Sequence, residues 1–74
     1  MFMPEDIQKL IATGLPGAQV EVVGDGHHFE AVVVTPDFAG KSMLQQHQIV
    51  YRALGSKMGN EIHALSLRTR APGE

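Results

Sequence analysis

The sequence predicts an α+β domain with the element order α-β-β-α-β, in which a three-stranded mixed sheet carries both helices on one face. A turn signal at Gly24–Gly26 separates two β-rich segments, which indicates a hairpin. A loop over Phe38–Ser42 leads into a helical pattern, and Glu61–Leu67 follows as a third β-rich segment. A helical crossover makes the strands that it joins parallel and is right-handed, so the third strand should pair with the second in parallel.

The first helix is expected to begin at Pro4 and to end near Gly14. Proline suits the first turn of a helix. The carboxylates of Glu5 and Asp6 suit the positive amino end that follows. Glycine and proline after the last apolar position stop the helix. The apolar residues at helical spacing are Ile7, Leu10 and Ile11.

Two strands are expected next, over Ala18–Val23 and Phe29–Val34. The first alternates partly between polar and apolar residues, whereas the second is nearly continuous in apolar residues, as a central strand should be. The Gly24–Gly26 segment suits the turn between them, because glycine and aspartate accept the positive φ angles of a tight hairpin. Thr35–Asp37 ends the second strand.

The second helix should follow Ser42, whose hydroxyl fits a capping box with the Gln45 amide. Its apolar stripe extends to Met58, and Gly59 closes the helix. The last strand is then Glu61–Leu67, and the tail over 68–74 is expected to be frayed. The stripe consists of Met43, His47, Val50, Tyr51, Leu54 and Met58.

Length and composition restrict the class of protein. The 74 residues form one domain, residues 1–74, because so short a chain cannot bury two cores. The absence of cysteine excludes a disulfide, a thiolate nucleophile and a cysteine-ligated metal site held by this chain alone. No apolar run reaches the ~20 residues of a membrane helix, and the acidic start does not fit a signal peptide. The cytoplasm is the expected compartment, with no membrane partner.

The formal charge is −2 but is unevenly distributed. Residues 1–40 hold one lysine against six acidic residues, and residues 41–74 hold five basic residues against two acidic ones. The carboxyl-terminal half could therefore present a basic face to an anionic partner. An ordinary solvated surface is the favoured interpretation for five scattered charges.

Two glycine motifs do not support a phosphate or nucleic-acid loop. Gly40-Lys41-Ser42 would need a glycine at position 35 to complete a phosphate-binding loop, and that residue is threonine. Gly14–Gly17 spells the G-x-x-G of KH modules but joins a helix to a strand instead of two helices.

Catalysis has little support in the residues. A general base needs a partner within reach and a pocket, and so small a sheet offers little cavity. Ser42 and His47 lie five residues apart on one helix, and Ser42 is committed to capping. We therefore expect no enzymatic activity.

Four histidines remain as candidate metal ligands. His47 belongs to the apolar stripe and is expected to be a half-buried, satisfied core residue. His27 and His28 follow the hairpin turn and are ordinary polar turn residues when taken alone. His63 is flanked by apolar residues in a strand position that threonine or valine would fill more readily. Taken singly, it is still favoured as a surface histidine.

A wider set of residues resembles the BolA-like family over about Ile7 to Pro72. The hairpin turn followed by His28-Phe29 is similar to the short-loop branch of that family. The resemblance implies a class II KH-like fold, which agrees with the α-β-β-α-β order. The residues that carry it are Phe38, Gly40, Lys41, Ser42, Gln46, His47, Val50, Tyr51, Leu54, Ile62, His63, Ala64 and Leu65.

The resemblance implies partnership with a monothiol glutaredoxin. The two proteins, with glutathione, would share a [2Fe-2S] cluster that serves iron–sulfur trafficking or iron and redox regulation. His63 matches the family's carboxyl-terminal histidine ligand, and His27 or His28 would supply the ligand from the loop between the first two strands. The isolated chain would bind no cluster. Gln46 departs from the arginine frequent in relatives, and the usual carboxyl-terminal aromatic residue is missing.

The alternative function is a KH-like nucleic-acid-binding transcriptional regulator of the stress-response type, a role also attributed to the family. Lys41, Arg52 and Lys57 would then contact phosphates of DNA or RNA. Against this alternative, the gripping loop is missing and stacking aromatic residues are few. A simple interaction module with neither property ranks third.

Overall fold

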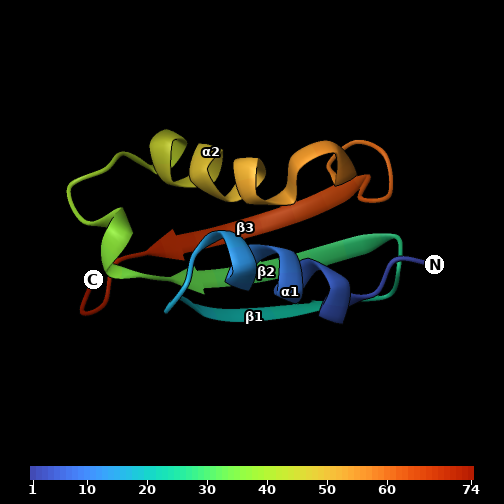
Figure 1. Ribbon diagram of the computed structural model, residues 1–74, viewed down its shortest axis with the longest axis horizontal. Helices are drawn as coiled ribbons and strands as arrows, with labels where there is room; N and C mark the ends of the chain where they lie inside the picture. Colours follow the sequence, from blue (N-terminus) through green and yellow to red (C-terminus); the bar gives the residue numbers. More distant parts are fainter.

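The computed structural model describes residues 1–74 and confirms the order α-β-β-α-β (Figure 1). Two short 3-10 helices, η1 and η2, flank the second α-helix. The elements are α1 (Pro4–Gly14), β1 (Gln19–Gly24), β2 (His28–Val34), η1 (Pro36–Phe38), α2 (Met43–Leu54), η2 (Gly55–Lys57) and β3 (Ala64–Arg70).

The three strands form one mixed sheet with β2 in the centre. β1 pairs with β2 in antiparallel register, with Gln19 opposite Val34. β3 pairs with β2 in parallel, with His28 opposite Ala64. The predicted topology is therefore confirmed. The crossover through α2 places the amino ends of β2 and β3 at the same end of the sheet.

α1 begins as its sequence predicts. Pro4 is its first residue, and the Asp6 carboxylate accepts a hydrogen bond of 2.7 Å from the Met3 backbone N–H. At the other end, a Cβ on Gly14 would lie 2.7 Å from the Ala53 Cβ. Glycine is thus required where α1 and α2 cross, in addition to marking the helix end.

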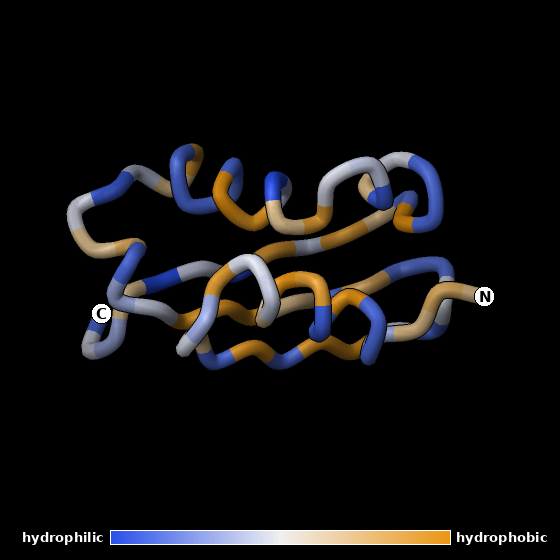
Figure 2. The backbone as a smooth tube through the Cα atoms, in the orientation of Figure 1, coloured by the Kyte–Doolittle hydropathy of each residue, from blue (hydrophilic) through white to orange (hydrophobic).

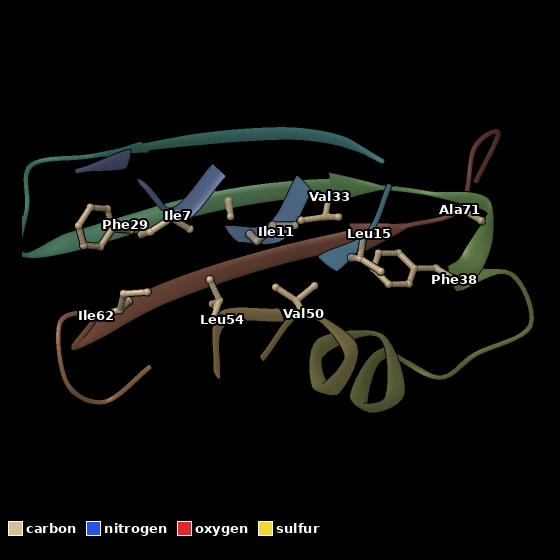
Figure 3. Packing of buried hydrophobic residues seen from close by; sticks show 11 residues of the cluster. Ile7, Ile11, Leu15, Phe29, Val33, Phe38, Val50, Leu54, Ile62 and Ala71 are labelled. Carbon is tan, nitrogen blue, oxygen red and sulfur yellow. The ribbon is translucent and has the colours of Figure 1, made fainter. Parts of the chain in front are cut away.

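Both helices bury their apolar stripes against the same face of the sheet. In Figure 2 the orange apolar segments of the helices and strands face one another, while the turns are mostly blue. Figure 3 shows Phe29 and Ile62 at one end of the core and Phe38 and Ala71 at the other. The buried cluster comprises Ile7, Ile11, Leu15, Phe29, Ala31, Val33, Phe38, Val50, Leu54, Ile62 and Ala71.

The start of α2 follows the predicted capping box. The Gln45 N–H donates to Ser42 Oγ at 3.1 Å, and the Ser42 N–H donates to Gln45 Oε1 at 2.9 Å. These bonds satisfy backbone donors that a helix start leaves free.

The predicted stripe and end of α2 are partly wrong. The helix ends at Leu54, because Gly55 turns the chain with a φ of +59°, and Met58 lies beyond η2. Met43 and Tyr51 point outward, with 69% and 39% of their surface exposed. The buried face is instead made by Gln46, Val50 and Leu54.

The prediction of a frayed tail is also wrong. β3 starts three residues later than predicted and continues to Arg70, which lies opposite Val34. The Thr35 N–H donates to the Arg70 carbonyl at 3.2 Å, and Ala71 is buried in the core. The parallel ladder with β2 therefore holds Arg68, Thr69 and Arg70, three of the seven residues that the sequence assigned to a tail.

A buried glutamine connects the crossover to the sheet. Gln46 Nε2 donates to the carbonyls of Phe38 (3.2 Å) and Lys41 (3.0 Å). Its Oε1 accepts from the hydroxyl of Thr69 in β3 at 2.7 Å. A buried side chain with all these partners satisfied holds the loop before α2 against the third strand.

We predict that Gln46→Ala will lower the free energy of unfolding by about 2 kcal/mol, because the Lys41 carbonyl and the Thr69 hydroxyl lose their partner in Gln46, and the Phe38 carbonyl keeps only the Lys41 N–H. In a domain of this size that corresponds to a fall of roughly 8–16 °C in the thermal midpoint. Gln48→Ala, on the exposed side of the same helix, is the matched control and should change the midpoint little. Equal effects of the two variants, followed by circular dichroism, would contradict this role of Gln46.

Candidate functional site

The three candidate ligand histidines gather at one end of the sheet. Because β2 and β3 are parallel and His28 pairs with Ala64, His63 and His27 are the next residues outward on adjacent segments. In Figure 1 this is the right-hand end, where both strands begin. All three side chains are exposed.

In the hairpin, the carboxylate of Asp25 fixes the backbone of His27 and His28. Asp25 Oδ1 accepts hydrogen bonds from the N–H groups of His27 (2.8 Å) and His28 (2.9 Å). Gly24 has no room for a Cβ against the His28 carbonyl and the Phe29 ring. The two backbone hydrogen bonds lower the pKa of Asp25, because they stabilise its charged form.

The third histidine is held by the residue before it. Ile62 is fully buried, its N–H donates to the Lys57 carbonyl at 3.0 Å, and its carbonyl accepts from the Gly59 N–H at 2.7 Å. His63 follows directly and is exposed to solvent.

The predicted setting of His63 therefore needs correction. It lies just before β3 instead of inside a strand, whereas its exposed imidazole agrees with the surface histidine that was favoured when it was taken singly. Its neighbours Ile62 and Leu65 pack in the core, which made the segment look like a continuous strand.

An ion pair stabilises the turn ahead of His63. Lys57 Nζ lies 2.8 Å from Glu61 Oε2. The hydrogen bond from Lys57 lowers the pKa of Glu61, because it stabilises the carboxylate. Both side chains are partly exposed, so solvent and salt screen this pair.

The donor set at this end suits a shared metal site. No imidazole of His27, His28 or His63 makes a hydrogen bond within the chain, so all three are free to coordinate. No group of three or more His, Cys, Asp or Glu side chains is close enough to enclose a metal ion. A metal cluster bound here would take one or two nitrogen ligands from this chain and the rest from another molecule.

His47 has a different position and role. It is half-buried in α2, as predicted, and its ring meets Tyr51 edge-on with the centroids 6.4 Å apart. The expectation that it is satisfied is wrong, because its buried Nε2 has no hydrogen-bond partner. His47 belongs to α2, whereas the candidate ligands lie at the starts of β2 and β3, and its side chain contributes to packing.

The three basic candidates do not form one surface. Lys41 precedes α2 and donates to the Asp37 carbonyl at 2.9 Å, while Arg52 lies in the last turn, roughly 15 Å further along the helix. Arg52 and Lys57 line a groove of about 540 Å³ between α1 and α2, together with Lys9, which sequence reasoning missed. The signal that could have identified Lys9 is its place in α1, where it directly precedes Leu10 of the apolar stripe and so lies at the border of the buried face.

The helices are short. The longest has 12 residues, and none combines the length and apolar character that crossing a bilayer requires.

Comparison with known proteins places these features in a family. The family model described as "BolA-like protein" matches residues 14–74, a range that contains every candidate ligand. Human BolA-like protein 1 is 39% identical over 51 residues, covering 69% of this chain and 37% of that protein. The acid stress protein IbaG of Escherichia coli is 36% identical over 70 residues, covering 93% of this chain and 83% of IbaG.

A solved structure agrees over almost the whole chain. The structure of a BolA protein homologue from Coxiella burnetii is 52% identical, with a TM-score of 0.88, and covers 97% of this chain and 94% of that chain. A relative from Haemophilus influenzae, 37% identical over 51 residues, is named DNA-binding transcriptional regulator BolA; the chain spans half of its length.

We predict that Asp25→Ala will loosen the hairpin at the start of β2, because the N–H groups of His27 and His28 lose their acceptor. Amide exchange at these two residues, measured by NMR, should become faster. Asp37→Ala is the control, since the Asp37 carboxylate makes no hydrogen bond in the chain.

The same carboxylate predicts a pH effect in the parent chain. Its folded pKa lies below the ordinary 3.8, so its stabilising effect is complete above that value and is lost as the pH falls through the lowered pKa. The His27 and His28 amide signals should shift in that acidic range, and titration at or above 3.8 would contradict the assignment.

Proposed function

The chain belongs to the BolA-like protein family, and we propose that it acts as a non-enzymatic partner of a monothiol glutaredoxin. The two proteins share a [2Fe-2S] cluster in iron–sulfur trafficking or in iron and redox regulation. One observation carries the proposal: exposed imidazoles from two adjacent segments lie at one end of the sheet, on backbones that the chain itself holds in place.

The support around each ligand fits this role. His63 follows the fully buried Ile62. A substitution of the exposed His63 side chain therefore leaves the packing of Ile62 in the core intact. His27 and His28 share the Asp25 carboxylate as a backbone acceptor, which limits the conformations of the loop before any metal binds. A ligand set on fixed backbone loses less entropy on binding than one on a free loop.

The chemistry of the donor set supports a shared cluster. This chain lacks cysteine, so the thiolates that bind the other iron come from glutaredoxin and glutathione. Imidazole in place of thiolate on one iron raises the reduction potential of a [2Fe-2S] cluster, as in Rieske centres. His63 would be one such ligand, and His28 or His27 the other.

The test mixes the apo chain with a cluster-loaded monothiol glutaredoxin and follows visible absorption and circular dichroism. Imidazole ligation should change the spectrum of the glutaredoxin homodimer at one-to-one stoichiometry, and His63→Ala should abolish the change. The change should weaken as the solution is made more acidic, because protons compete with the metal for a ligand imidazole.

Variants of the other histidines give the controls. His47→Ala should lower the thermal midpoint but keep the new spectrum, because this residue packs in α2. His27→Ala and His28→Ala, tested separately, identify the second ligand. A His63→Ala spectrum identical to that of the parent chain would refute the site even if the two proteins still associate.

A second candidate function is nucleic-acid binding in transcriptional regulation. The name of the Haemophilus influenzae relative favours it, as does the groove where Lys9, Arg52 and Lys57 converge. The Lys57–Glu61 ion pair and the Asp6 carboxylate in the same groove reduce its positive potential. We therefore rank this function second.

Nucleic-acid binding by this chain should be weak and sensitive to salt. Two to four phosphate contacts give a slope of log K against log salt of roughly −2 to −4. Lys9→Ala and Arg52→Ala should each weaken binding and reduce the slope by about one. Arg52→Lys keeps the charge and should keep the slope. Tight binding that resists salt, measured by fluorescence anisotropy, would contradict this prediction and favour a dedicated regulator.

A further inference from the structure

The face of the sheet opposite the helices carries no covering element, and we call it the open face. Figure 3 shows Ile7 and Ile11 of α1 and Val50 and Leu54 of α2 converging on the other face. Side chains alternate along each strand, so the register assigns every second residue to the open face. These residues are Gln19, Glu21 and Val23 of β1; His28, Glu30, Val32 and Val34 of β2; and Ala64, Ser66, Arg68 and Arg70 of β3.

The charges of the open face are divided between its two edges. Glu21 on β1 lies opposite Val32 on β2, and Val32 lies opposite Arg68 on β3. One row across the sheet therefore reads acidic, apolar, basic. Adjacent strands are about 4.8 Å apart, so this glutamate and arginine are separated by about 10 Å of backbone with a valine between them.

These two charges have no partner within the chain. The single ion pair of the molecule is Lys57–Glu61, on the other side of the fold. Glu21 and Arg68 are exposed, and they border a hollow of about 250 Å³ on the open face that also includes Val32. The hollow offers room for side chains of another molecule with the complementary charge order.

We propose that the open face binds the open face of a second copy of this chain, with a two-fold axis along β2. This rotation places β1 of one copy over β3 of the other. Glu21 then meets Arg68 of the second copy, Arg68 meets its Glu21, and Val32 packs on its Val32. The row is self-complementary, as an isologous interface requires.

The charges also exclude the other face-to-face arrangement. A two-fold axis across the strands would place β1 over β1, so that acidic residues face acidic ones and Arg68 approaches arginines. In the proposed arrangement a single like-charge contact remains, between Glu30 on the axis strand and its counterpart. We therefore expect a weak dimer whose affinity changes with salt and with substitutions of these charges. The proposal rests on the charge order of Glu21, Val32 and Arg68 and not on the proposed glutaredoxin partnership, although the candidate ligand His28 lies at the end of the same face.

The experiment is sedimentation equilibrium of the full chain from micromolar to millimolar concentration. The parent chain should show a reversible monomer–dimer equilibrium that weakens with salt. Glu21→Arg and Arg68→Glu should each weaken the dimer at least tenfold, because each makes two like-charge contacts. The combined Glu21→Arg, Arg68→Glu variant restores both pairs and should restore the dimer, and Glu30→Gln should strengthen it.

NMR dilution provides the second measurement. Amide shifts of Val32 and Arg68 should depend on concentration, while those of α1 should not. The substituted side chains are exposed, so circular dichroism should show unchanged folds. A parent chain that stays monomeric throughout, single reversals without effect, or a double variant that remains monomeric would each overturn the proposal; the first would assign the open face to solvent or to another protein.

Discussion

The parallel pairing of β3 with β2 is the constraint on which the rest of the structure depends. Parallel strands need a crossover, and here the crossover is α2 with the loops before and after it. The pairing brings the start of β3 to the start of β2, so His63 and His28 lie at the same end of the sheet although 35 positions separate them in the sequence. It also places α2 on the face of the sheet that α1 covers, so the other face stays open.

The pairing is held at both ends by specific contacts. At the far end, Gln46 joins the loop before α2 to Thr69, and the Thr35 N–H bonds the carbonyl of Arg70. At the end that carries the histidines, the buried Ile62 fixes the approach to β3. The backbone near the candidate ligands therefore depends on core packing, whereas the imidazoles themselves contribute little to folding.

Much of the fold could be predicted from local sequence signals. Features that depend on contacts between residues far apart in the sequence could not. The hairpin turn and the Ser42 cap act through neighbouring residues, and both were predicted correctly. The length of β3 and the burial of Gln46 depend on partners far away in sequence, and a polar glutamine is typical of a surface position. The start of β3 after His63 was missed for the same reason, since pairing with β2 sets the bounds of that strand. The fold alone does not select one ligand among the candidate histidines, because the proposed coordination requires a second molecule.

The distribution of polar groups separates folding from binding. Inside the chain, buried polar side chains such as Thr35 and Gln46 have their partners, with the Nε2 of His47 as the exception. Outside, the imidazoles at the sheet end and the charges of the open face lack partners within the chain. A neutral, exposed imidazole remains hydrated and costs the fold little, whereas the same group buried without a partner would be destabilising. The chain can therefore keep its candidate ligands accessible without metal, which is the property that the proposed shared cluster would require of a partner without cysteine.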